Sequence, residues 1–165
     1  MVRETIDPAD AQRVRASFER QNAMRALGIE LVEVRPGEVE LAMPASERLT
    51  QQHGFLHAGI VATGLDSACG YAAFSLMPPE AAVLTVEFKI NLLAPAAGER
   101  FVFRAGVTKA GRTISVSDGR AYALREGKES LIATMTATLM AVVGREDIRH
   151  PVSYTHLRAH ETKAN

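Results

Sequence analysis

Six segments of the chain alternate between apolar and polar residues, which is the period of a β-strand with one buried face. They are 29–35, 38–43, 84–92, 100–109, 112–125 and 129–143. Pro36 and Gly37 lie between the first two segments and predict a hairpin turn there. Turn residues also separate the last four segments, at Pro95, Gly98, Gly111 and Gly127. We expect these four segments to form an antiparallel meander.

The apolar positions also predict which side of a strand faces the core. In segment 84–92 the predicted inner face holds Leu84, Val86, Phe88, Ile90 and Leu92. The opposite face holds Thr85, Glu87, Lys89 and Asn91. In segment 129–143 it holds Leu131, Ala133, Met135, Ala137, Leu139 and Ala141. Threonines occupy the opposite face of that segment, which favours a strand over a helix because β-branched side chains fit a pleated surface.

Two helices are predicted in the N-terminal half. Asp7, followed by proline, is typical of a helix start, and this helix is expected to run to about Ala26 and to stop at Gly28. The second helix lies within 53–73 and consists mostly of small and apolar residues around one ionisable group, Asp66. A helix that is apolar on all sides needs cover on nearly every side. We therefore expect an α+β fold, in which a curved antiparallel sheet of about six strands wraps one long central helix.

Composition limits the class of protein. The chain has 165 residues, of which 47% are hydrophobic, and its 19 basic residues balance 19 acidic ones. This composition fits one packed domain over residues 1–150 and excludes the basic footprint of a general nucleic-acid binder. Residues 151–165 lack periodicity and resemble translated vector sequence, so we expect a non-native or disordered tail there.

The single cysteine, Cys69, cannot form an internal disulfide and is expected to be a small buried thiol. Together with an N-terminal segment that lacks the apolar stretch of a secretory signal, it predicts a cytoplasmic location. The apolar run 58–77 is not expected to enter a membrane, because a charge such as Asp66 at its centre costs about 2.5–3.5 kcal/mol on insertion scales.

Asp66 is the strongest candidate for chemistry, since a carboxylate is almost never buried without a partner or a function. The helix start at Ala58 and Gly59 adds a second element, because free backbone amides there can stabilise an oxyanion. At about 1.5 Å per residue, roughly 12 Å separate Asp66 from Ala58 along the helix axis. One carbonyl group cannot touch both ends, so a shared reaction requires a two-fold dimer in which each helix start faces the other subunit's carboxylate. A purely structural role for Asp66 is the alternative.

The other candidates favour simpler roles. His57 precedes the helix and is expected to cap it or to donate an orienting hydrogen bond. His53 and His57 have a spacing that can hold zinc on a helix, but Gly54 and the lack of a third ligand nearby argue against a metal. No convincing general base accompanies Cys69, so a thiol nucleophile is not expected. No phosphate-binding or dinucleotide-binding glycine motif is present, and we expect no cofactor.

One pattern in the chain resembles a known family, the hotdog-fold acyl-CoA thioesterases of the phenylacetate-degradation (PaaI-like) type. The residues that carry the resemblance are Gln51, His57-Ala58-Gly59, Asp66, Thr85-Val86-Glu87-Phe88 and Pro95. It covers about residues 20–143 and implies a long helix wrapped by a curved sheet. It also implies hydrolysis of an acyl-CoA thioester to a carboxylic acid and free coenzyme A, by homodimers that associate into homotetramers.

By the same resemblance, Asp66 matches the catalytic acid of the family, acting as general base or as nucleophile. Ala58 and Gly59 match the two glycines of its His-Gly-Gly motif, whose amide helps to form the oxyanion hole. His57 matches the motif histidine, which holds the helix entrance or the thioester.

Further residues take their expected roles from the resemblance. Gln51 stands where many members have asparagine near the thioester, and Thr85 where they have serine or threonine assisting the catalytic water. Lys109 and Arg112 are candidates for contact with the coenzyme A phosphates. The apolar side chains expected to line the acyl pocket are Leu65, Tyr71, Phe74 and Phe88.

Two other functions remain open on the sequence alone. A hotdog hydratase or dehydratase would act on acyl thioesters with an acid–base pair of histidine and carboxylate, whereas here His57 and Asp66 are separated along the helix. A non-catalytic acyl-CoA binding module would keep the cleft without turnover.

Overall fold

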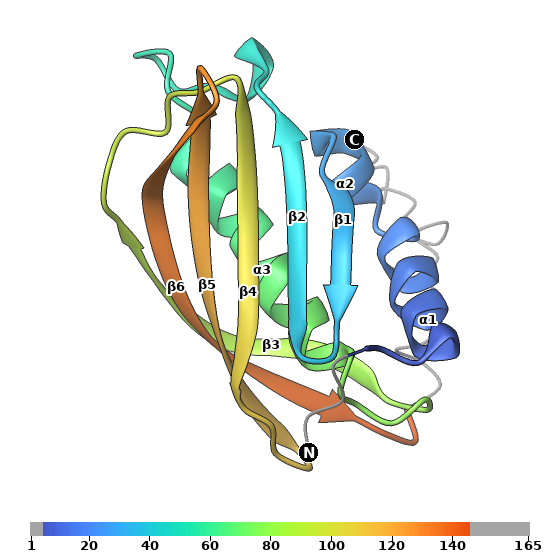
Figure 1. Cartoon of the computed structure of the whole chain (residues 1–165). Coiled ribbons are helices and arrows are strands. Elements are labelled where there is room, and N and C mark those ends of the chain that lie inside the picture. The colour runs from blue at the N-terminus through green and yellow to red at the C-terminus, as the bar shows by residue number, and fades with distance from the viewer. Residues whose placement is uncertain (1–4, 146–165) are drawn as a thin grey trace, which may run out of the picture.

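The computed structural model describes residues 5–145, which form one six-stranded antiparallel sheet with a long helix packed against one face (Figure 1). The sheet order is β1-β2-β4-β5-β6-β3. The strands are β1 (Glu30–Arg35), β2 (Glu38–Pro44), β3 (Ala82–Leu92), β4 (Arg100–Lys109), β5 (Ile114–Arg125) and β6 (Lys128–Val142). The helices are α1 (Pro8–Glu19), α2 (Asn22–Leu27), the short 3-10 helix η1 (Glu47–Leu49) and the central α3 (Ala58–Phe74). The predicted α+β architecture is confirmed, whereas the expectation for 151–165 lies outside the described residues.

The predicted meander of four strands is wrong at its first strand. β4, β5 and β6 are sequential neighbours, but β3 pairs with β6 at the far edge of the sheet, while β4 pairs with β2. The connection 93–99 explains the difference, because it is longer than the two to five or so residues typical of a hairpin loop. It can therefore carry the chain past β6 and β5 to β4. Strand periodicity shows that a segment is a strand but not which strand is its neighbour.

A bulge in β6 changes the predicted inner face at one end. The pairing with β5 skips Ile132, which is an extra residue between Leu131 and Ala133. Ile132 is consequently buried and Leu131 exposed, opposite to the prediction. The Ile132 carbonyl accepts hydrogen bonds from the N–H groups of Leu93 and Ala94, which ties the start of the connection 93–99 to β6.

The predicted N-terminal helix is divided into α1 and α2. Gln21 between them has an extended backbone, and its side-chain amide donates a 2.9 Å hydrogen bond to the hydroxyl of Tyr71 on α3. The helix is therefore interrupted at Gln21, where the side chain makes a tertiary contact with Tyr71 instead. The predicted stop is confirmed, because Gly28 ends α2 in a left-handed conformation with φ of 68°.

α1 is held against the end of α3 by polar and aromatic contacts. The Arg13 guanidinium donates to the carbonyls of Phe74 and Met77, at 3.2 and 3.0 Å, and stacks over the Phe74 ring at 4.2 Å. Phe18 meets the Tyr71 ring edge-on with centroids 5.4 Å apart. Tyr71 and Phe74 are thus part of the α1–α3 contact.

Close packing of α3 on the sheet depends on Gly64. A Cβ at this position would lie 2.6–2.7 Å from ring atoms of Phe103, which is fully buried on β4. A Cβ on Gly70 in the same helix would meet no atom within 4 Å. We expect Gly64→Ala to lower the free energy of unfolding by about 1–3 kcal/mol through overpacking. Gly70→Ala should raise it by up to about 1 kcal/mol through helix propensity. Urea unfolding of the two variants measures the difference, and equal effects would contradict this packing.

Candidate active site

The start of α3 is shaped by His57. This residue is the N-cap, and its Nδ1 accepts a 2.9 Å hydrogen bond from the N–H of Gly59. The absence of a side chain at Gly59 permits this contact, since a Cβ there would lie 3.1 Å from Nδ1. The Gly59 amide is therefore already occupied. In the described part of the chain no acceptor is found for the Ala58 N–H, and Ala58 is exposed.

Asp66 lies near the middle of α3 and is half-buried. The hydroxyl of Thr85 on β3 donates a 2.8 Å hydrogen bond to its Oδ1. The two residues predicted to act near the catalytic water are thus in direct contact. Because only one carboxylate oxygen takes this bond, Oδ2 remains available to a water molecule or a substrate atom.

A bulge in β3 brings Thr85 to Asp66. Thr85 pairs with Leu139 and Glu87 with Thr138, so Val86 is an extra residue in the strand. Directly paired residues share a face of the sheet, and Leu139 is fully buried on the α3 side. Thr85 therefore faces α3, as bulges near active sites often re-aim one side chain.

The same bulge corrects the predicted inner face of β3. Phe88, Ile90 and Leu92 pair with buried residues of β6 and lie on the face of Thr85. Leu84 lies on the opposite face, since it pairs with Met140 next to Leu139. Strict alternation had placed Leu84 with Phe88 and opposite Thr85. An inserted residue shifts the alternation by one, and the local sequence contains no glycine that would reveal it.

Several apolar side chains of β3 are largely uncovered, and two of them, Phe88 and Leu92, lie on the face of the sheet that packs against α3. Val86, Phe88 and Leu92 are 56%, 44% and 56% exposed. β3 is also an edge strand, so one row of its backbone N–H and C=O groups has no neighbour within the described sheet. An apolar, unpaired edge of this length is unusual on a protein that remains a monomer.

Gln51 lies in the loop before α3. Its side-chain oxygen accepts a hydrogen bond from the His53 N–H, and its backbone N–H donates to the Phe55 carbonyl at 2.8 Å. These bonds hold the loop in a compact turn. The Gln51 side chain and Ala58 line the same cavity of about 210 Å³ at the start of α3.

The other predicted substrate contacts are less well placed. Lys109 and Arg112 are exposed at the β4–β5 turn, at the end of the sheet where β3 begins, and the structure shows no bond from either to the residues above. The predicted acyl-pocket lining is wrong for Tyr71 and Phe74, which pack beneath α1, and for Leu65, which is fully buried against the sheet. Helix amphipathicity is weak in α3, so the sequence could not show which face each residue takes.

Cys69 is buried in α3, and the structure supports its inert role. Burial, assisted by the negative charges of Asp66 and Asp118, raises the pKa of the thiol to about 12. The thiol therefore stays protonated at neutral pH and is a poor nucleophile. We expect no reaction of Cys69 with a disulfide reagent at about pH 8 in the folded protein, and one equivalent of reaction after unfolding in urea. Rapid stoichiometric labelling of folded protein would contradict this environment.

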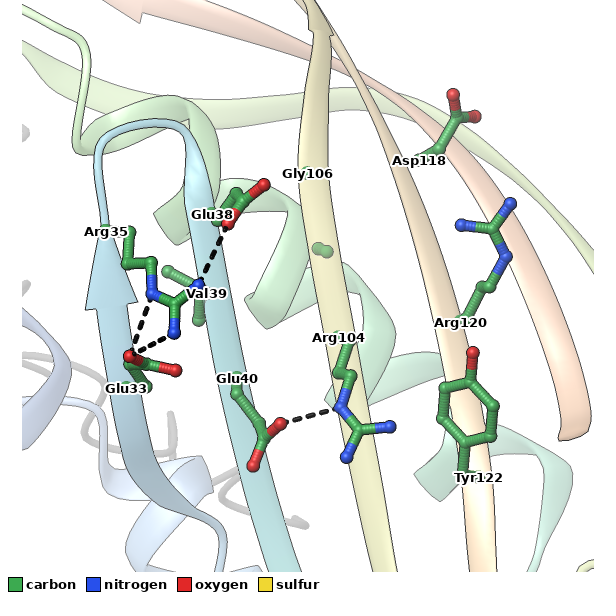
Figure 2. Close-up of a pocket in the computed structure, with 11 residues that line it drawn as sticks. Glu33, Arg35, Glu38, Val39, Glu40, Arg104, Gly106, Asp118, Arg120 and Tyr122 are labelled. Atoms are coloured by element: carbon green, nitrogen blue, oxygen red, sulfur yellow. Dashed lines mark hydrogen bonds and ion pairs between the residues drawn. The ribbon is translucent and has the colours of Figure 1, made fainter. Parts of the chain in front are cut away.

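A larger hollow, of about 440 Å³, lies on the outer face of the sheet, away from α3 (Figure 2). Arg104 donates to Glu40 at 2.6 Å and to both carboxylate oxygens of Glu129 at 2.7 Å. These bonds raise the pKa of Arg104 above its ordinary value, and those to Glu129 have the largest effect. Arg35 pairs with Glu33 at 2.8 Å. The charged groups of this hollow are largely neutralised by one another, so it is a weaker candidate than the region around Asp66.

Within residues 5–145 no three histidine, cysteine or carboxylate side chains are grouped as metal ligands would be. In the same range no helix is long and apolar enough to cross a membrane.

Comparison with known proteins decides the family. Residues 53–130, which include α3 and β3, match the thioesterase superfamily. Acyl-coenzyme A thioesterase 13 of Homo sapiens is 34% identical over 106 residues, which are 62% of this chain and 74% of that protein. The chain belongs to the thioesterase superfamily. Its matches to curated relatives span 64% to 74% of the length of those proteins.

Solved structures agree with this superfamily. A thioesterase family protein from Silicibacter pomeroyi is 66% identical, with a TM-score of 0.81 over 82% of this chain and 99% of that one. The PaaI protein of E. coli has a TM-score of 0.72 at 22% identity, covering 81% and 93% of the two chains, and shares the fold. The predicted hotdog fold and thioesterase family are confirmed, and with the family the enzyme class of thioester hydrolases.

Proposed function

We propose that the protein hydrolyses acyl-CoA thioesters to a carboxylic acid and free coenzyme A. The observation that carries the proposal is the pair formed by Asp66 and Thr85, which faces the uncovered edge of β3. The carboxylate has one oxygen held by the Thr85 hydroxyl, and the apolar surface beside it can take a hydrophobic substrate or a second subunit.

The active site is composite and lies between two copies of the chain. Ala58 and Asp66 are on one helix, roughly 12 Å apart along its axis. In a two-fold homodimer formed through β3, the Ala58 amide of each subunit faces the Asp66 carboxylate of the other. This arrangement would cover Val86, Phe88 and Leu92 and pair the exposed strand edge. Two such dimers form the homotetramer that the family resemblance implies, and the cytoplasm remains the predicted location.

In the reaction, the Ala58 N–H donates a hydrogen bond to the thioester carbonyl oxygen and stabilises the negative charge that develops there. Asp66 of the other subunit either takes a proton from the attacking water or attacks the acyl carbon itself. In the first route the water oxygen bonds to the acyl carbon and the C–S bond breaks. In the second, water hydrolyses a mixed anhydride after the C–S bond has broken. The coenzyme A thiolate then takes up a proton in either case.

The remaining predicted residues support this reaction. His57 holds the helix entrance through its bond with the Gly59 N–H, so the Ala58 amide is the one free to bind the carbonyl. Gln51 contacts the thioester from the loop, and Thr85 orients Asp66 and its water. Phe88 contributes an apolar surface for the substrate. Lys109 and Arg112 remain candidates for the coenzyme A phosphates.

Incubation of the purified protein with a series of acyl-CoAs, with a thiol reagent as detector, tests the proposal. We expect release of free coenzyme A in proportion to enzyme concentration. Hydration of an enoyl-CoA without thiol release would show a hydratase instead, and retention of acyl-CoA without turnover would show a binding module. Single-turnover hydrolysis in ¹⁸O-water separates the two routes, because only the covalent one can place label in the Asp66 carboxylate.

A further inference from the structure

The cavity at the start of α3 has a buried, apolar inner wall. Val61 on α3, Ala96 in the connection after β3 and Ile132 at the bulge of β6 line it, and all three are buried. Leu92 and Phe55 stand at the more exposed side. The cavity therefore has an inner end formed by core side chains and an outer side next to the uncovered edge of β3.

Most polar groups around this cavity already form hydrogen bonds with other groups of the protein. Gln51 is the one lining residue with a polar side chain, and its oxygen already accepts from the His53 N–H. The Leu56 N–H donates to the Ala96 carbonyl at 3.0 Å, and the Ile132 carbonyl is taken by two backbone amides. A group carrying several amides, such as the pantetheine arm of coenzyme A, would lose hydrogen bonds to water and could replace few of them along this apolar wall. An apolar group has no such cost.

The position of Ala58 links this cavity to the reaction. Ala58 lines the cavity and also carries the free N–H at the start of α3. Val61 follows it by three residues, so the two side chains lie on neighbouring positions of the helix surface. A carbonyl oxygen bound at the Ala58 N–H therefore sits at the mouth of the cavity, with its carbon chain free to extend inward.

We infer that this cavity holds the acyl group of the substrate and that Val61, Ala96 and Ile132 limit its size. The inference rests on the proposed thioesterase function and specifies its substrate class. The cavity volume of about 210 Å³ is below the roughly 300–1,000 Å³ typical of pockets for drug-sized ligands. It accepts a short or medium aliphatic acyl group or a single aromatic ring, and it is too small to enclose a long fatty acyl chain.

Cavity variants with a matched control test the inference. Val61→Ala enlarges the cavity, Ala96→Val narrows it, and Val14→Ala removes the same atoms from a fully buried site on α1 that does not line it. The readout is the ratio of kcat/KM for decanoyl-CoA to that for butyryl-CoA. We expect this ratio to rise about tenfold or more in Val61→Ala and to fall by a similar factor in Ala96→Val, as methylene-sized changes in a hydrophobic pocket do. Val14→Ala should leave it unchanged.

The possible outcomes of this experiment distinguish the inference about the cavity from the proposed thioesterase function. A shift in opposite directions in the two cavity variants supports the inference, and either variant alone suffices if the other does not fold. An unchanged ratio in a folded, active cavity variant overturns the inference and leaves the thioesterase function intact. If the wild-type protein releases no coenzyme A from any acyl-CoA, the proposed function fails and the inference fails with it.

Discussion

Asp66→Asn is expected to lower kcat for acyl-CoA hydrolysis by about 10²- to 10⁴-fold, because a carboxamide can neither take a proton from water nor attack an acyl carbon. Asparagine has nearly the same volume as aspartate and keeps an oxygen that can accept the 2.8 Å hydrogen bond from Thr85. The fold and the thermal unfolding midpoint should therefore be preserved. Initial rates of coenzyme A release, measured beside circular dichroism, give both quantities.

Asp118→Asn is the matched control for this variant. Asp118 is also a half-buried aspartate that accepts hydrogen bonds from threonines, Thr108 and Thr136, and these bonds lower its pKa. It lies on β5 at the outer hollow of the sheet, away from α3 (Figure 2). We expect near wild-type hydrolysis from Asp118→Asn. Near wild-type hydrolysis from Asp66→Asn would refute the catalytic assignment of Asp66.

Ala58→Pro should lower kcat by about 10²- to 10³-fold, the usual effect of removing one oxyanion donor. Ala58 is the first residue of α3, where proline fits the helix and removes only the N–H. The extended backbone of His57 before it, with ψ of 137°, is the conformation that a following proline prefers. The substitution therefore replaces the N–H hydrogen of residue 58 with a ring carbon while leaving the helix start intact.

Ala58→Gly provides the comparison, because it keeps the N–H and alters only the side chain. We expect this variant to retain most of the activity. If both variants lose activity equally while remaining folded, the side chain of Ala58 rather than its amide matters, and the oxyanion assignment is wrong. Steady-state rates over a range of acyl-CoA concentrations distinguish a loss in kcat from a weaker KM.

Much of this site could be predicted from the sequence because its elements are local. The apolar segment around Asp66 predicted one long buried helix, and the arithmetic of helical rise already separated Asp66 from Ala58. Alternation located all six strands, and the proline and glycine after β1 located its hairpin. These features depend on residues close to one another in the chain.

What could not be predicted depends on tertiary contacts. The extra residue Val86 aims Thr85 at Asp66, yet nothing in its local sequence distinguishes it from a regular strand position. The cavity residues Val61 and Ile132 were missed, since a buried aliphatic side chain has the same pattern whether it borders a void or a packed core. Tyr71 was misplaced because its partner, Gln21, lies 50 residues away.

In the proposed dimer each active site combines Ala58 of one subunit with Asp66 of the other, and a subunit-mixing experiment tests this arrangement. Asp66→Asn and Ala58→Pro are each expected to be nearly inactive, whereas a mixed dimer of the two contains one site with both native residues. After exchange of subunits in equal amounts, about half of the dimers are mixed, so hydrolysis should recover to about a quarter of the wild-type rate. If mass spectrometry shows complete exchange and the mixture stays as inactive as its components, the site is not shared and the account is wrong.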